Sequence, residues 1–422
     1  MHPRPSSSRP AVLVGVVVVC CAVLALGWWS KARCLGEGAW SGGEQYTQWC
    51  YTDVYALWFS SGLSEGAPLY ADHPGREHAV EYPVLTGAQM WAAARVAALT
   101  PPAQRAAAFF HATAALGAAA ALATLGLLAA AGRPPRRLLW WAGAPTLALL
   151  AFVNWDPVPV ALLVAGVVAH RRGRDGLAGV AAGLGAAAKL FPGLLVPLVV
   201  ATRLAQGRRR DAAAHAGAAA AAWLAVNLPV LVTAPQGWRR FLDLNRERPA
   251  DWDSLWYLAE QLRGSAFAVP TVNAASAALL VAGAAAIAVV GARRREPARW
   301  WELVLPLMAW FLLTNKVYSP QFSLFLLPLM ALALPRAGPF VAFVAADVAV
   351  FAVRFPFLGG LTGLEPAPDY AWFGAAVVVR AAVLVWVILA AVRGQPARTA
   401  AGGVPYSGGG AGAGVGSGSG GR

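Results

Sequence analysis

Apolar runs alternate with short polar segments along most of the chain, and many of these polar segments are rich in arginine. Several apolar runs are shorter than the roughly twenty residues that a straight helix needs to cross a bilayer, which predicts tilted or broken helices. The pattern predicts an all-α polytopic membrane protein of about twelve transmembrane helices, in a domain spanning residues 11–393. The candidate spans are residues 11–29, 106–131, 138–153, 157–170, 177–188, 190–204, 212–234, 271–292, 300–314, 321–335, 339–356 and 371–393.

The basic residues predict how these spans are oriented. The first run, 11–29, lacks a small-residue cleavage site and therefore reads as a retained span with a cytoplasmic segment, 1–10, before it. Cytoplasmic loops accumulate Lys and Arg, so the basic clusters belong inside. The Gly-rich segment 394–422 is then a flexible cytoplasmic tail. The clusters that share this side are residues 133–137, 170–174, 207–210 and 292–299, with Arg336 and Arg393.

Composition supports the membrane class and excludes others. The chain is 58% hydrophobic and 13% charged, with a mean hydropathy of +0.54, whereas a soluble domain carries roughly a quarter charged residues. The net charge of +14 follows from basic cytoplasmic loops, and no basic stripe interleaved with aromatic residues indicates nucleic-acid binding. The sequence also lacks the motifs of P-loop ATPases, zinc proteases of the H-E-x-x-H type and C-x-x-C redox proteins.

The same topology leaves the remaining polar segments on the outer face. All three lysines, Lys31, Lys189 and Lys316, fall there, against the positive-inside trend. Ionisable groups in such positions are candidates for function. The outer segments are the first loop, about 30–105, then 154–157 and 189–192, a second large loop of about 235–270, and 315–321.

Asp53 is a lone acid among aromatic and aliphatic residues in "WCYTDVYALWF" of the first outer loop. It is a candidate for catalysis, with Tyr55 among the aromatic residues that could contact a substrate. The alternative is that Asp53 caps the helix that follows it, because Asp is a favoured N-cap residue. In the same loop, Cys34 and Cys50 lie in an oxidising compartment and can form a disulfide, which is worth roughly 3 kcal/mol in the entropy model.

The other outer candidates also have purely structural alternatives. Lys189 and Lys316 can extend toward the interface or pair with a carboxylate for packing. Asn154 and Asp156 can be turn and cap residues before the Pro-initiated helix rather than substrate contacts. The remaining candidates are Asp251 and Asp253 of "DWD". This pair is similar to the metal-binding acids of soluble nucleotide-sugar transferases, although a three-residue pattern also arises by chance.

Several motifs, in order, carry a resemblance over residues of about 40–335. They are "CYTDVYALWFSSGLSEGAPLY", "EYPVLTG", "NWDPVPVALL", "GLGAAAKLFPGLLVPL", "NRERPADWDSLWY" and "LLTNKVYSPQFSLFLLP". Together they resemble the actinobacterial members of glycosyltransferase family 87, in the C-type glycosyltransferase superfamily. The resemblance implies transfer of a sugar, usually mannose, from a polyprenyl-phosphate carrier to a glycan or glycolipid outside the cytoplasmic membrane. It implies a catalytic acid in the first outer loop, where Asp53 matches and where Glu81 and Asp72 are further acids.

The chemistry of such a transfer accounts for these residue types. A polyprenyl phosphate is a good leaving group, so positive charge at the phosphate is needed more than a general acid. Lys316 and Lys189 are the first candidates for binding the donor phosphate, with Arg246 and Arg248 in reserve. Asp53 would be the general base of an inverting, single-displacement reaction that requires no metal or other cofactor. The candidate substrate contacts are Tyr55, Glu81, Tyr82, Asn154, Asp156, Asp251, Asp253, Asn315, Tyr318 and Gln321.

A polytopic transporter or lipid flippase of the cell envelope is the alternative function. Transporters place their substrate sites near the bilayer midplane and often consist of repeated halves. Here the polar groups gather at one face and no repeat is evident. The expected partners are therefore a lipid-linked sugar donor, a glycan or glycolipid acceptor and the lipid bilayer.

Overall fold

A computed structural model describes residues 8–36, 38–70 and 80–393, and this part of the chain is helical without strands. Six of its helices are long and apolar enough to cross a membrane. With the shorter apolar helices beside them, they confirm an all-α, multi-pass membrane protein. These six are α1 (Ser8–Ala32), α5 (Arg105–Ala130), α11 (Arg209–Thr233), α14 (Val269–Arg294), α17 (Ala337–Leu361) and α18 (Tyr370–Arg393).

The other six expected runs also form helices, but these are short or broken, and the count of about twelve spans stays a prediction. Proline explains many of the breaks, because it lacks a backbone N–H and is tolerated mainly in the first turn of a helix. The run 138–153, for example, is divided at Pro145. The segments are α6 (Pro135–Ala142) with α7 (Pro145–Leu150), α8 (Pro157–Arg171), α9 (Asp175–Ala188), η3 (Phe191–Leu194) with α10 (Leu195–Ala205), η4 (Pro297–Leu303) with α15 (Val304–Thr314), and η5 (Pro320–Phe325) with α16 (Leu326–Ala333).

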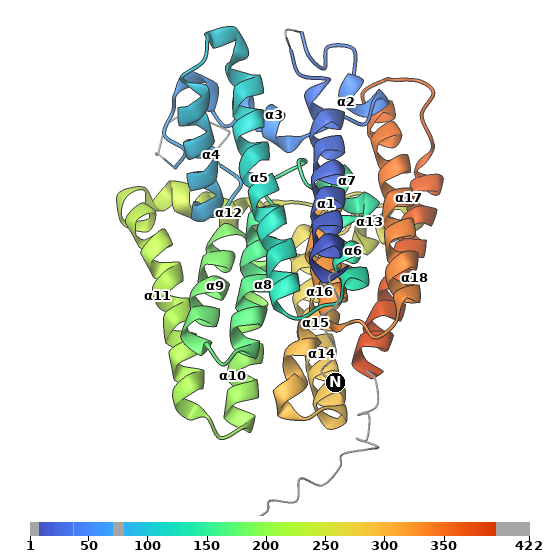
Figure 1. The fold of residues 1–422 in the computed structure, drawn as a ribbon. Coiled ribbons are helices and arrows are strands. Elements are labelled where there is room, and N and C mark those ends of the chain that lie inside the picture. The colour runs from blue at the N-terminus through green and yellow to red at the C-terminus, as the bar shows by residue number, and fades with distance from the viewer. Residues whose placement is uncertain (1–7, 37, 71–79, 394–422) are drawn as a thin grey trace, which may run out of the picture.

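The expected outer segments form short helices. Figure 1 shows α2, α3 and α4 at the end of the molecule opposite the marked N-terminus. A continuous core of buried apolar side chains joins the spans below them. The helices of these segments are α2 (Glu44–Thr47), α3 (Asp53–Ser60), η1 (Leu63–Glu65), α4 (Val84–Ala97), η2 (Pro102–Gln104), α12 (Pro235–Glu247) and α13 (Leu255–Arg263).

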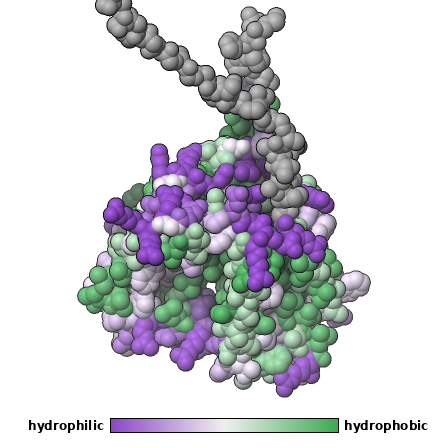
Figure 2. All heavy atoms as spheres, turned by 90° about the horizontal axis from the view of Figure 1, so that it is seen from below, coloured by the Kyte–Doolittle hydropathy of each residue, from purple (hydrophilic) through white to green (hydrophobic). Residues whose placement is uncertain are grey.

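Arginines gather at the opposite end, where helices leave their last carbonyl groups without helical partners. Arg137 donates to a carbonyl oxygen just after α16 at 2.7 Å, and Arg172 donates to one at the end of α5 at 2.6 Å. Arg295 donates to the carbonyl oxygens of the last residues of α18. Figure 2 views this end and shows hydrophilic side chains gathered across it. Clusters that are distant in the sequence therefore share one face. The expected tail 394–422, and residues 1–7 of the expected N-terminal segment, lie outside the described residues.

Candidate active site

The backbone at the start of α3 fixes the position of Asp53. Thr52 is the N-cap residue, because its hydroxyl oxygen accepts from the N–H of Val54 at 3.3 Å. Asp53 is the first residue of the helix itself, so the alternative in which its side chain caps α3 is wrong. The Asp53 N–H donates to the carbonyl oxygen of Val153 at 2.8 Å, which joins this loop to the segment between α7 and α8. The carboxylate is thus free to make other contacts.

Three side chains from three separate segments bond to the half-buried Asp53 carboxylate. The Tyr51 hydroxyl donates to Oδ1 at 2.7 Å. The Asn154 amide donates to Oδ2 at 2.8 Å, and the Gln321 amide donates to the same oxygen over a longer 3.4 Å. Tertiary folding therefore brings together residues that lie up to 268 positions apart.

The amide orientation of Asn154 follows from its backbone neighbour. The N–H of Trp155 donates to Asn154 Oδ1 at 2.6 Å, so the oxygen must face it and the amide nitrogen must face the other way. That nitrogen donates to Asp53 and, at 2.6 Å, to the Tyr82 hydroxyl. Burial, followed by the negative charge of Asp53, raises the pKa of Tyr82 well above its usual value, so the hydroxyl keeps its proton.

Lys189 lies against a carboxylate, as its structural alternative expects. Its ammonium is 2.7 Å from Asp156 Oδ1 and 4.5 Å from the ring centre of Phe322. Asp156 is buried and occupies the N-cap position of α8 without a side-chain capping bond. Because Asp156 neutralises it, Lys189 offers less positive charge to a phosphate than an unpaired lysine would.

Lys316 has a different environment. Its ammonium donates to the carbonyl oxygens of Arg248 at 2.6 Å and Arg246 at 3.3 Å, at the end of α12. Among the described residues, no carboxylate forms an ion pair with Lys316. The side chains of Arg246 and Arg248 are exposed, although Arg248 approaches Asp251 at 3.9 Å. The end of α12 and Lys316 therefore form a region of positive charge, which we call the α12 cation cluster: Arg246, Arg248 and Lys316.

The two acids of "DWD" face arginines. Arg354 Nε lies 2.5 Å from Asp253, and Arg380 lies 3.8 Å from it. Arg354 also approaches Asp251 at 4.0 Å. Both acids are buried, and within the described ranges no three His, Cys, Asp or Glu side chains group as a metal site would require. Two acids already neutralised by guanidinium groups do not fit a metal-binding pair.

Sequence reasoning missed the two arginines that neutralise these acids and a further acid beside them. Arg354 and Asp347 lie on α17 and Arg380 lies on α18, and all three are buried. Asp347 accepts from Ser323 at 2.6 Å and lies 3.6 Å from Arg380. The available signal was the presence of three ionisable residues inside the apolar runs 339–356 and 371–393, because such residues face inward partners.

The other expected substrate contacts bond elsewhere. Asn315 donates to a carbonyl oxygen of its own loop at 2.8 Å, and the Tyr318 hydroxyl contacts Ser323 at 3.1 Å. The Tyr55 hydroxyl reaches a backbone carbonyl at 3.4 Å. Glu81 is exposed and forms no ion pair with the described residues, and Asp72 lies outside them. Among these candidates, Tyr82, Asn154 and Gln321 gather at Asp53.

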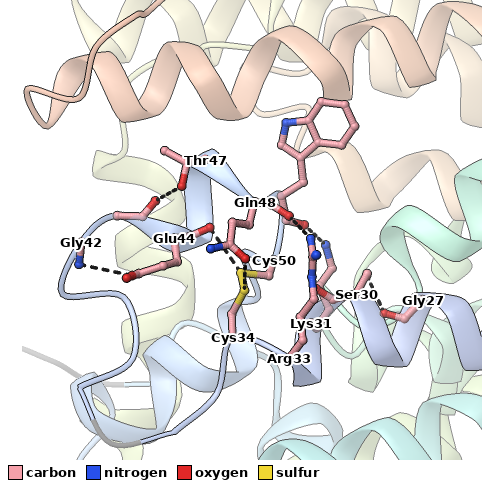
Figure 3. Close-up of a disulfide and its surroundings, with 12 residues drawn as sticks. Gly27, Ser30, Lys31, Arg33, Cys34, Gly42, Glu44, Thr47, Gln48 and Cys50 are labelled. Atoms are coloured by element: carbon pink, nitrogen blue, oxygen red, sulfur yellow. Dashed lines mark hydrogen bonds between the residues drawn. A yellow bond between two sulfur atoms is a disulfide. The ribbon is translucent and has the colours of Figure 1, made fainter.

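The loop before Asp53 is fixed to the end of α1 (Figure 3). A disulfide joins Cys34 to Cys50. The buried ammonium of Lys31 donates to the carbonyl oxygen of Trp49 at 2.8 Å. The guanidinium of Arg33 donates to the carbonyl oxygen of Gln48 at 2.6 Å. Residues 48–50 are therefore held directly ahead of Asp53.

The chain was compared with curated proteins, with solved structures and with models of protein families. No curated protein matches the chain. Two solved structures of ArnT from Cupriavidus metallidurans, one bound to undecaprenyl phosphate and one in the apo state, are similar to it at 15% and 16% identity. Both have a TM-score of 0.46, and the alignments cover 90% and 91% of this chain and 77% of each ArnT chain. A family model described as glycosyltransferase family 87 matches residues 82–315, which is more than half of the chain. The chain therefore belongs to glycosyltransferase family 87.

Proposed function

We propose that this glycosyltransferase moves a sugar, mannose by the resemblance of its motifs, from a polyprenyl-phosphate carrier to a glycan or glycolipid acceptor. The observation that carries the proposal is the convergence of three hydrogen-bond donors on the half-buried carboxylate of Asp53. Donors that fix the orientation of a carboxylate suit a general base, because the proton acceptor must be aimed at the reacting hydroxyl. Asp53 precedes the range that the family model matches, so its role rests on this geometry and on the motif around it.

The reaction needs one base and one leaving group. Asp53 accepts the proton of the acceptor hydroxyl while that oxygen bonds to the anomeric carbon. The bond from this carbon to the carrier phosphate breaks, and its electron pair stays on the phosphate oxygen. A single displacement inverts the anomeric centre, so a β-linked donor yields an α-glycoside.

The α12 cation cluster is the preferred site for the donor phosphate. Among the described residues, Lys316 and Arg246 of this cluster form no ion pair with a carboxylate, and Arg248 only approaches Asp251 at 3.9 Å, whereas Asp156 neutralises Lys189 at 2.7 Å. Lys316 has three ammonium protons, and two are used on carbonyl oxygens, which leaves one for a phosphate oxygen. Fixed positive charge at the departing phosphate stabilises the transition state, so the proposal includes no required metal or cofactor.

The function is tested with the purified protein in lipid vesicles. Labelled polyprenyl-phosphate mannose and a mixture of cell-envelope glycolipids are supplied, and the products are separated by chromatography. We expect the label to move to a glycolipid. Use of a nucleotide-linked sugar in place of the lipid-linked donor would contradict the proposal. So would movement of the intact lipid across the bilayer without transfer, which is the outcome that a flippase predicts.

The Lys316→Met variant is expected to use the lipid-linked donor poorly, because it removes a cation from the proposed phosphate site. We expect kcat/KM for the donor to fall by about 10- to 100-fold, the size of a lost charge-assisted hydrogen bond. Arg263→Met is the matched control, since Arg263 is an exposed cation on α13. Equal donor kinetics in the two variants would move the phosphate away from Lys316.

We further propose that the arginine-rich end faces the cytoplasm and that transfer occurs on the outer side. The gathered arginines support this orientation. Cysteines placed at the exposed positions Gln261 and Arg210 report on the two ends. A membrane-impermeant maleimide added to intact cells is expected to label Gln261→Cys above the background of the parent protein and to leave Arg210→Cys unlabelled. The reverse pattern would invert the topology.

A further inference from the structure

The hydrogen bonds of Asp53 distinguish its two carboxylate oxygens. An ionised carboxylate has about four lone-pair sites, two on each oxygen. Oδ2 accepts from both Asn154 and Gln321, so its two sites are occupied. Oδ1 accepts from Tyr51 alone among the described residues. One site on Oδ1 therefore remains for a proton.

Tyr51, which supplies the single donor to Oδ1, is held on several sides. Its ring stacks with Trp40 at 5.7 Å and with Tyr46 at 6.1 Å between centroids, with interplanar angles of 18° and 12°. Phe355 of α17 packs against it at 5.5 Å. Its backbone N–H donates to the carbonyl oxygen of Gln45 at 3.0 Å. This packing leaves the phenol few ways to move relative to Asp53.

Tyr51 also keeps the proton that it donates. The negative charge of Asp53, followed by burial, raises the pKa of Tyr51 well above its usual value. The hydroxyl therefore remains an O–H donor at neutral pH.

We propose that Tyr51 is a positioning residue that aims the remaining lone pair of Asp53 Oδ1 at the acceptor hydroxyl. This inference rests on the proposed transferase function and assigns the proton to one atom. The acceptor proton moves to Oδ1 as the acceptor oxygen bonds to the anomeric carbon, and the carrier phosphate leaves with the electron pair. Asn154 and Gln321 hold Oδ2 and so keep the carboxylate from turning.

The Tyr51→Phe variant tests this in the vesicle transfer assay, with Tyr46→Phe as the matched control. Tyr46 lies on the same stack, and its hydroxyl makes no hydrogen bond to Asp53. We expect kcat of Tyr51→Phe to fall about 10- to 100-fold, from the loss of a hydrogen bond to a charged group, with the donor KM changed by less than about twofold. Removing a donor favours the protonated carboxylate, so the acid limb of the pH–rate profile should move to higher pH. Tyr46→Phe should match the wild type.

A second substitution keeps the test decisive if Tyr51→Phe folds poorly. Fluorotyrosine at position 51 preserves the ring and the hydroxyl but makes the phenol a stronger donor. We expect it to move the acid limb to lower pH, opposite to Tyr51→Phe. An unchanged kcat and pH profile in Tyr51→Phe, or an unchanged profile with fluorotyrosine, would overturn the inference. Absence of transfer by the wild-type protein would instead reject the proposed function, and the inference with it.

Discussion

Asp53→Asn is expected to lower turnover by a factor on the order of 10²–10⁴ while the protein still folds and inserts. Asn has nearly the size of Asp but cannot accept a proton at neutral pH. The change does not remove a helix cap, because Thr52 caps α3. Transfer is measured in the vesicle assay at equal amounts of protein, and the thermal midpoint of each variant reports on folding.

Glu81→Gln is the control for this prediction. Glu81 is an acid of the same outer loop, but it is exposed and does not bond to the residues around Asp53. We expect its turnover to stay within about twofold of the wild type, as for a surface group outside the reacting centre. A nearly active Asp53→Asn beside an inactive Glu81→Gln would move the general base to Glu81.

Arg354→Met is expected to destabilise the protein by about 3–5 kcal/mol, because it breaks a buried ion pair and leaves a charge without its main partner. Arg354 Nε is 2.5 Å from Asp253, and both side chains are buried. Arg380 remains 3.8 Å from Asp253 and also serves Asp347, so it compensates only in part. Thermal unfolding in detergent micelles should show a clearly lower midpoint than for the wild type.

Arg248→Met is the control for Arg354→Met, because Arg248 is an exposed partner of the same acidic segment, whereas Arg354 is a buried one. Arg248 is exposed and lies 3.9 Å from Asp251. Exposed pairs are worth about 0–1 kcal/mol, so this variant should unfold close to the wild type. If Arg354→Met unfolds at the same temperature as Arg248→Met, then Asp253 does not need the Arg354 charge for stability.

The sequence alone determined the fold class, because burial in lipid requires long apolar runs and helices satisfy their own backbone groups. It also determined that the arginine clusters share one face, since alternating spans place every second loop on the same side. Asp53 could be selected because a single acid among aromatic residues is unusual in an apolar chain. These properties depend on the pattern of residues that are close together in the sequence, so a single sequence is enough to predict them.

Only the tertiary structure decided the partners of each polar group. Asn154 and Gln321 lie 101 and 268 positions from Asp53, and no local pattern specifies that they meet. The structure distinguished Lys189, which Asp156 neutralises, from Lys316, which bonds to carbonyl oxygens. The sequence specifies which residues carry a charged group. What that charge can do depends on which partners the packed helices place within a few ångströms of it.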